Sequence, residues 1–219
     1  MNNNLTELVF ILDRSGSMGG LEKDTIGGYN SFIEKQQKED GEANLTTVLF
    51  DHSYELLHDR VDIKKVSPLT GKEYFVRGTT ALLDAIGITI TKIGQKLDAA
   101  AEAERPGKVL FVITTDGMEN ASKEYTADKV KSMIEHQKEK YSWEFLFLGA
   151  NIDAVKTAMS FGIDENMAVD FCADEAGVRL NYEVMAKEVA EFRKSKSKKM
   201  AEGWKTEIFE DFEKRSSKK

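Results

Sequence analysis

Short, continuously apolar runs that alternate with segments of helical periodicity constrain the fold of this chain most strongly. Three of these runs are ELVFILD at 7–13, KVLFVITT at 108–115 and WEFLFLG at 143–149. Strands with this pattern are buried on both faces, as in parallel sheets that helices cover. Strands alternating with helices form parallel crossover units. The sequence therefore predicts an α/β fold with a doubly wound, mostly parallel, Rossmann-like open sheet and helices on both faces.

The other segments fit the same scheme. The spacing of apolar residues predicts helices over 21–38, 81–104, 126–140, 153–161 and 174–194. Further strands are expected at 44–51 and 167–171. Residues 54–66 mix polar and apolar β-formers, so they are expected to lie at the edge of the sheet as a hairpin or an antiparallel strand. We expect one domain over 1–195, followed by a basic, amphipathic helical extension over 196–219.

Charge and cysteine content restrict the class of protein. The net charge is −7, but residues 193–219 carry +5 and the first 192 residues carry −12. An acidic body argues against nucleic-acid binding. The N-terminus has no basic and apolar signal segment, and no apolar run approaches the roughly 20 residues that span a bilayer. The single cysteine excludes an internal disulfide. We therefore expect a cytoplasmic protein that is not inserted in a membrane.

The C-terminal extension has two notable features. The run RKSKSKK at 193–199 could contact phosphates or anionic lipid, but the solvated end of a helix explains it more simply. Trp204, Ile208, Phe209 and Phe212 then recur at a spacing that puts them on one face of a short helix. The sequence leaves open whether that face docks on the domain or binds a partner.

Three polar clusters lie beside the predicted core elements. One is DRSGS at 13–17, directly after the first strand. The second is GTT at 78–80, directly before the long helix, and the third is TDG at 115–117, directly after the third core strand. In doubly wound sheets, ligands bind beyond the carboxyl ends of the strands, where these three loops can converge. Gly16, Gly78 and Gly117 allow such loops to turn tightly and approach one another.

The side chains in these clusters favour a hard metal ion. Two carboxylates and several hydroxyls are oxygen donors, which suit Mg²⁺ or Mn²⁺ rather than zinc or copper. Two neighbouring carboxylates repel each other unless a cation lies between them. With only two negative charges facing it, the metal would stay electrophilic and attract another carboxylate. The clusters therefore predict a divalent-cation site.

These residues resemble the metal-ion-dependent adhesion site of von Willebrand factor type A domains. The family pattern is Asp-x-Ser-x-Ser, a distant Thr and a distant Asp-Gly turn. The matching positions are Asp13, Ser15, Ser17, Thr80 and Asp116. The segments GTTALLDAI and VITTDGMEN also look like this family, and the resemblance covers about residues 5–170. It implies that the two serines and the threonine ligate Mg²⁺, or Mn²⁺ or Ca²⁺, and that the two aspartates ligate directly or through water.

The resemblance also implies a function. A Glu or Asp of an unidentified partner protein would complete the metal's coordination, so the chain would be a binding or adaptor domain, compatible with a bacterial-type complex, and not an enzyme. The residues expected to touch the partner are the loop neighbours Arg14, Met18, Thr79, Gly117 and Met118. Two alternatives stay open: a metal-dependent phosphoester hydrolase, and a scaffold whose metal is structural. Against the hydrolase, position 15 is a serine where such enzymes place a second acid, and Glu119 is more simply a solvated loop acid.

Overall fold

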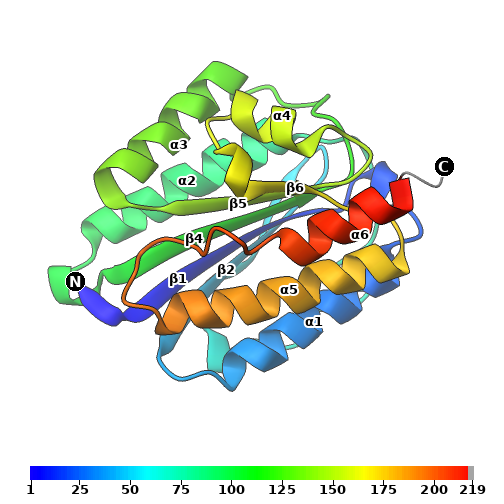
Figure 1. Ribbon diagram of the computed structural model, residues 1–219. Helices are drawn as coiled ribbons and strands as arrows, with labels where there is room; N and C mark the ends of the chain where they lie inside the picture. Colours follow the sequence, from blue (N-terminus) through cyan, green and yellow to red (C-terminus); the bar gives the residue numbers. More distant parts are fainter. Residues whose placement is uncertain (217–219) are drawn as a thin grey trace.

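A computed structural model describes residues 1–216, and it confirms the doubly wound α/β architecture (Figure 1). Its single sheet has six strands in the order β3-β2-β1-β4-β5-β6. The strands are β1 (Asn2–Asp13), β2 (Glu42–Phe50), β3 (Tyr54–Asp62), β4 (Pro106–Thr115), β5 (Glu144–Gly149) and β6 (Ala168–Asp170). All neighbouring pairs are parallel except β2 and β3, so the expected antiparallel edge strand is β3.

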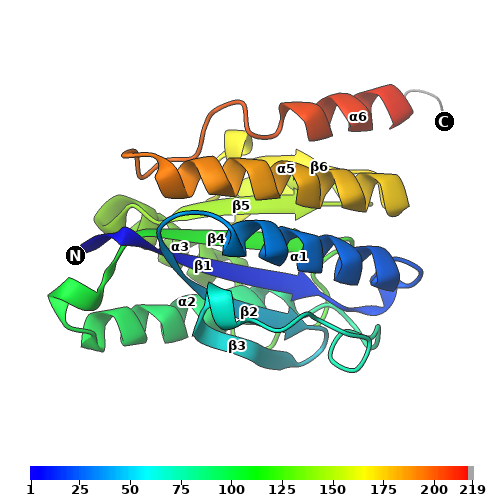
Figure 2. The same cartoon turned by 90° about the horizontal axis from the view of Figure 1, so that it is seen from below.

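Helices cover both faces of the sheet (Figures 1 and 2). They are α1 (Glu22–Gln37), α2 (Leu82–Ala99), α3 (Ala127–Tyr141), α4 (Ala154–Ser160), α5 (Glu175–Lys194) and α6 (Thr206–Ser216). Side chains of α1, α5 and α6 share one apolar core with alternate residues of the strands, and those of α2, α3 and α4 share the other. Alternate strand residues enter opposite cores because successive side chains of a strand point to opposite faces.

The order of the strands reverses between β1 and β4. From β1 the chain proceeds outward through β2 to β3, and from β4 it proceeds the other way through β5 to β6. The crossover helices therefore lie on opposite faces of the sheet on either side of this point, and the carboxyl ends of β1 and β4 are the position at which doubly wound sheets bind ligands. Asp13 is the last residue of β1, and Asp116 follows the last residue of β4.

Three elements differ clearly in length from the sequence-based prediction. The edge strand, expected within 54–66, ends at Asp62 and is followed by a 3₁₀ turn at Ile63–Lys65. The first strand begins at Asn2 rather than at residue 7, because the amide of Asn2 donates to the carbonyl of Arg105 beside the start of β4. The long helix ends at Ala99 rather than at 104. Its last turn gives way to extended backbone at Ala100 and a short 3₁₀ turn at Glu102–Glu104. Alanines at 99–101 carry no signal for this end.

The C-terminal extension docks on the domain. Trp204 is buried and its indole donates a 2.9 Å hydrogen bond to the carbonyl of Asn166. Ile208 is also buried, whereas Phe209 is 50% exposed, so only part of the predicted apolar face is covered. Residues 217–219 of the predicted extension lie outside the described residues. Within residues 1–216 no helix combines the length and apolar character needed to cross a bilayer.

Candidate metal centre

The three loops meet as predicted, and their hydroxyls touch. Ser15 Oγ lies 3.0 Å from Ser17 Oγ, and the hydroxyl of Thr80 donates to Ser15 Oγ over 3.0 Å. The main-chain amide of Gly16 donates to the carbonyl of Gly78 over 3.1 Å, which joins the first loop to the second. Gly78 has φ +68°, a left-handed conformation that favours glycine. The first two loops therefore form one continuous hydroxyl surface.

Gly117 brings the third loop to the same place. A Cβ atom added there would lie 2.8 Å from Ser17 Oγ and 3.3 Å from Thr80 Oγ1. Any larger residue would displace the hydroxyls, so this close approach requires glycine. All five residues predicted to hold the metal are thus brought together at the ends of β1 and β4.

The two carboxylates are buried but differ in their partners. Asp13 accepts hydrogen bonds from the amide of Ser15 at 2.7 Å and from the hydroxyl of Thr115 at 2.6 Å. Burial raises its pKa, and these hydrogen bonds oppose part of the rise. By contrast, neither carboxylate oxygen of Asp116 accepts a well-directed hydrogen bond from any residue within 1–216, although both are buried.

The environment of Asp116 disfavours its charge. Burial and, to a smaller extent, the negative charge of Asp13 raise its pKa, the nearby Ser17 hydroxyl lowers it, and the net result is a pKa of about 6. A buried carboxylate without partners is costly unless a proton or a cation neutralises it. The donor set therefore fits a divalent cation. Hard oxygen donors are what Mg²⁺, Mn²⁺ and Ca²⁺ prefer. No cluster of three or more His, Cys, Asp and Glu side chains within the described chain could hold a metal.

Three residues outside the predicted set of ligands hold this centre in place. Thr115 binds Asp13, and its hydroxyl also accepts from the amide of Gly117 at 3.3 Å. Tyr74, itself buried, donates from its hydroxyl to the main-chain carbonyl of Asp13 at 2.6 Å. Asn120 accepts from the amide of Thr80 at 2.9 Å. Thr115 belongs to the polar cluster at 115–117 and Asn120 to the segment VITTDGMEN, whereas no pattern in the sequence indicated Tyr74.

The structure contradicts the expected partner contact of Arg14. Its side chain is completely buried, and its guanidinium donates to Asp51 at 2.9 Å and to Glu55 at 2.7 Å. Asp51 also accepts from Arg77 at 2.8 Å. Burial alone would raise the pKa of Asp51, but the hydrogen bonds from the two arginines hold it below its ordinary value. No pattern in the sequence indicated this pairing, because Asp51 follows the neighbouring strand β2 and meets Arg14 only in the folded chain.

Met18 was also wrongly expected to face a partner. It is buried in the core shared with α1 and α5, because the short 3₁₀ helix at Gly16–Met18 turns its side chain inward. The other three positions are accessible: Thr79 is exposed, Gly117 is half-buried and Met118 is 73% exposed.

Glu119 is not a solvated loop acid. One carboxylate oxygen accepts from the amides of Ala121 and Ser122, and the other accepts from the amide of Leu83 and the hydroxyl of Ser122. It thereby caps the first turn of α2. The carboxylate thus joins its own loop to the start of α2. Because both of its oxygens accept hydrogen bonds, it is poorly placed to act as a general base.

Solved structures with the same fold are von Willebrand factor A domains. Proximal thread matrix protein 1 of the mussel byssus, solved with zinc in its MIDAS motif, is 15% identical at a TM-score of 0.58, over 87% of this chain and 47% of that one. The manganese-loaded TRAP protein of Plasmodium vivax is 21% identical at 0.52, over 68% and 58%. The von Willebrand domain of a type V pili tip protein from Porphyromonas gingivalis is 12% identical at 0.59, over 84% and 94%.

These matches establish that the chain has the von Willebrand factor A fold. The chain spans about half the length of several of these proteins, for example 45% of the ArnB paralogue VWA2 from Sulfolobus acidocaldarius. No protein-family profile and no curated protein matches the sequence itself.

Proposed function

We propose that the chain binds a partner protein through a divalent cation held at the carboxyl ends of β1 and β4. One observation carries this proposal: the carboxylate of Asp116 is buried and has no hydrogen-bond partner in the described part of the chain, and it lies beside the Ser17 hydroxyl. A cation neutralises such a group and binds the surrounding oxygens. Mg²⁺ is the ion we propose, with Mn²⁺ or Ca²⁺ as substitutes.

The residues present suggest a division of roles. Ser15, Ser17 and Thr80 would ligate the ion through their hydroxyls, and Asp13 and Asp116 would do so directly or through water. Two carboxylates leave the ion short of negative charge, so the ion supplies an electrophilic position for a further carboxylate. The zinc-occupied mussel protein and the manganese-loaded Plasmodium protein support a divalent ion in this fold.

An acidic side chain of a partner protein is the ligand that this centre would attract. Thr79 and Met118 are exposed on two of the loops that form the centre, so we propose that they contact the partner around the metal. Arg14 and Met18 are excluded from that role by their burial.

A phosphoester hydrolase is the main rival function. It would need a nucleophile or an activated water and a positioned acid or base. Ser15 stands two residues after Asp13, and Glu119 has both oxygens engaged by hydrogen bonds. We therefore propose that the centre binds and does not turn over phosphate esters. A screen of phosphomonoesters with Mg²⁺ tests this: turnover that Asp13→Asn abolishes would establish the rival.

Titration calorimetry tests the metal itself. We expect Mg²⁺ or Mn²⁺ to bind weakly to the wild type and not detectably to Asp13→Ala. The same titration compares Thr80→Ala with Thr79→Ala. Thr79→Ala is the matched control, because the two threonines are adjacent and only Thr80 contacts Ser15. Equal binding by the wild type and Asp13→Ala would refute the metal site.

Capture from a cell extract with Mg²⁺ or with EDTA tests the partner. Thr80→Ala should weaken capture without unfolding the chain, because the main-chain bonds of Thr80 to Asn120 and Ala121 do not need its side chain. A complex that survives both EDTA and Thr80→Ala would show that another surface binds it. If calorimetry shows metal binding but no partner depends on it, the third possibility, a scaffold with a structural metal, is favoured.

A further inference from the structure

A hollow of about 570 Å³ opens at the end of the sheet opposite the candidate metal centre, where β4 begins. Its walls include Pro106 and Gly107, the first two residues of β4, whereas Asp116 of the metal centre follows the last. The length of the strand therefore separates the two places, about 30 Å at roughly 3.3 Å per residue. Small-molecule sites have volumes of about 300–1,000 Å³. The hollow thus has the size of a ligand site of its own.

Two aromatic side chains line this hollow at the end of α3. The helix ends at Tyr141, and Ser142 adopts a left-handed conformation (φ 56°), after which the chain enters β5 through Trp143. Trp143 is buried, and its ring stacks on that of Phe111 with 5.4 Å between the centroids. The ring of Tyr141 lies 6.5 Å from that of Trp143 and is 48% exposed. A fixed ring and an accessible ring therefore lie together in the wall of the hollow.

Three cations also line the hollow, against two acids. The cations are Arg105, Lys140 and Lys198, and the acids are Asp98 and Glu102. The guanidinium of Arg105 is held in place, because it donates to main-chain carbonyls at the end of α2. Neither lysine forms an ion pair with a residue in the described part of the chain. Positive charge is thus in excess here, although the first 192 residues together carry −12.

We propose that this hollow binds a small molecule in which an aromatic ring carries an anionic group, either a carboxylate or a phosphate. The ring would pack against Tyr141 and Trp143, because aromatic rings attract one another in stacked or edge-on arrangements. The anionic group would accept charge-assisted hydrogen bonds from Lys140, Lys198 and Arg105. Each half of such a ligand finds its complement in the same hollow.

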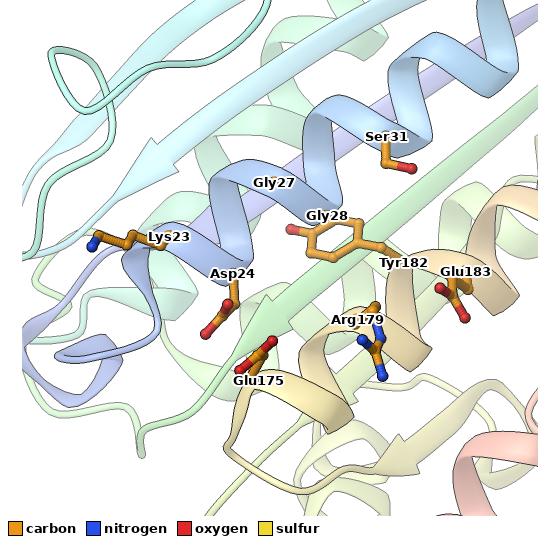
Figure 3. Close-up of a pocket in the computed structure, with 9 residues that line it drawn as sticks. All are labelled: Lys23, Asp24, Gly27, Gly28, Ser31, Glu175, Arg179, Tyr182 and Glu183. Carbon is orange, nitrogen blue, oxygen red and sulfur yellow. The ribbon is translucent and has the colours of Figure 1, made fainter.

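The groove between α1 and α5 lacks this combination (Figure 3). It is smaller, about 260 Å³, and its lining has three acids and two cations: Asp24, Glu175, Glu183, Lys23 and Arg179. Its aromatic side chain, Tyr182, is only 4% exposed. The ring lies against Gly28, where an added Cβ atom would be 2.2 Å from Cδ2 of the tyrosine. Because its acids outnumber its cations and its ring is covered, this groove does not suit an aromatic anion.

The indole N–H signals in an NMR spectrum of the full chain test the proposal. The sequence has two tryptophans: Trp143 lines the hollow, and Trp204 donates its indole hydrogen bond to Asn166. Titration with indole-3-acetate, a carboxylate, or adenosine 5′-monophosphate, a phosphate, should shift the Trp143 signal saturably and leave the Trp204 signal in place. Trp204→Phe assigns the two signals. The tighter probe identifies the anionic group, and the absence of a saturable Trp143 shift with both probes overturns the proposal.

Neutral probes test whether the charge is needed. Indole-3-acetamide and adenosine keep the two ring systems but lack the negative charge. Each should bind at least about 10-fold more weakly than its charged counterpart, because the charge-assisted hydrogen bonds are lost. Equal affinity of the charged and neutral probes would refute an anion site.

Substitutions in the wall locate the bound probe. An added Cβ atom at Gly94 on α2 would meet only Gln137 Nε2, at 4.0 Å, so Gly94→Leu should fold and fill the hollow, abolishing binding. Lys140→Gln should weaken binding about 3–10-fold. Lys92→Gln is the matched control: both lysines lie over a tyrosine ring, but Lys92 does so at Tyr54, outside the hollow. Unchanged binding by Gly94→Leu, or equal losses in the two lysine variants, would contradict the assignment.

Discussion

The hydroxyl of Thr115 donates a 2.6 Å hydrogen bond to Oδ2 of Asp13. These residues end the two adjacent strands at which the sheet order reverses, so the bond fixes one carboxylate at the floor of the candidate metal centre. The other carboxylate, Asp116, follows Thr115 directly and receives no such support within residues 1–216. This asymmetry leads to the first two predictions.

Replacing Asp116 by asparagine should separate stability from metal binding. Without metal, Asp116→Asn removes a buried charge whose pKa is raised to about 6, so at pH 7.5 it should raise the free energy of unfolding. We expect a gain of about 1–3 kcal/mol. The variant should also lose the stabilisation that Mg²⁺ gives the wild type. Urea denaturation with Mg²⁺ and with EDTA measures both. A variant that is less stable in EDTA would argue against an uncompensated carboxylate.

Removing the Thr115 hydroxyl should loosen Asp13. Thr115→Val keeps the shape of the side chain but leaves Oδ2 of Asp13 without its charge-assisted donor, so it should destabilise the chain by about 1.5–3 kcal/mol. Metal affinity should fall as well, because the carboxylate is no longer held. Calorimetry with Mn²⁺ is the measurement, and Thr115→Ser is the control that retains the hydroxyl. If valine and serine behave alike, the hydrogen bond has no role in metal binding.

Arg14 should matter for folding rather than for partner binding. Arg14→Leu leaves the buried Asp51 with the partly exposed Arg77 and the imidazole of His52 as its neighbours. Losing one member of a buried ion pair costs about 3–5 kcal/mol. Arg77→Ala removes the more exposed partner and should cost about 1 kcal/mol or less. Chemical denaturation of both variants checks the ranking, and equal losses would mean that burial does not set the strength of this network.

The C-terminal extension should contribute to the stability of the whole domain. Trp204→Ala removes a buried indole and its hydrogen bond to Asn166, at a cost of about 3–5 kcal/mol. Phe209 lies in α6, which follows the turn that carries Trp204, and is 50% exposed, so Phe209→Ala should change stability by no more than about 0.5 kcal/mol. Thermal unfolding of the pair is the measurement. A neutral Trp204→Ala would show that the extension is not part of the folded unit.

Glu7 should make stability depend on pH. Its side chain is buried on β1, where burial raises its pKa from 4.5 to about 7 despite the nearby Arg60. Below pH 4.5 the group is protonated in both states. Between 4.5 and 7 only the unfolded state ionises fully, so stability falls as the pH rises through this window.

Glu7→Gln removes this titration. The variant's free energy of unfolding, relative to the wild type, should therefore increase from pH 5 to pH 8 by on the order of 2–3 kcal/mol. Denaturation at a series of pH values measures it, with Glu34→Gln, an exposed change on α1, as the control for loss of a charge. A constant difference across this range would show that Glu7 does not titrate there.

Some of this protein is determined by local sequence. The apolar runs that became β1, β4 and β5 and the periodic segments between them predicted the sheet, because burial on both faces leaves an unmistakable pattern. The metal-site residues were also identifiable, since Asp13, Ser15 and Ser17 are neighbours in sequence and Thr80 and Asp116 directly flank predicted elements.

Tertiary structure alone decided which loop residues lie at the candidate metal centre and which are buried in the interior. Arg14 and Met18 lie within the same short motif as Ser15 and Ser17, yet they are buried, one beside Asp51 and the other in the core. Leu97, Arg105 and Lys140 lie on three separate segments and line a single hollow. A loop, unlike a helix or a strand, has no regular period, so the direction of a side chain in it does not follow from its position in the sequence. Contacts between distant segments exist only once the helices have packed on the sheet.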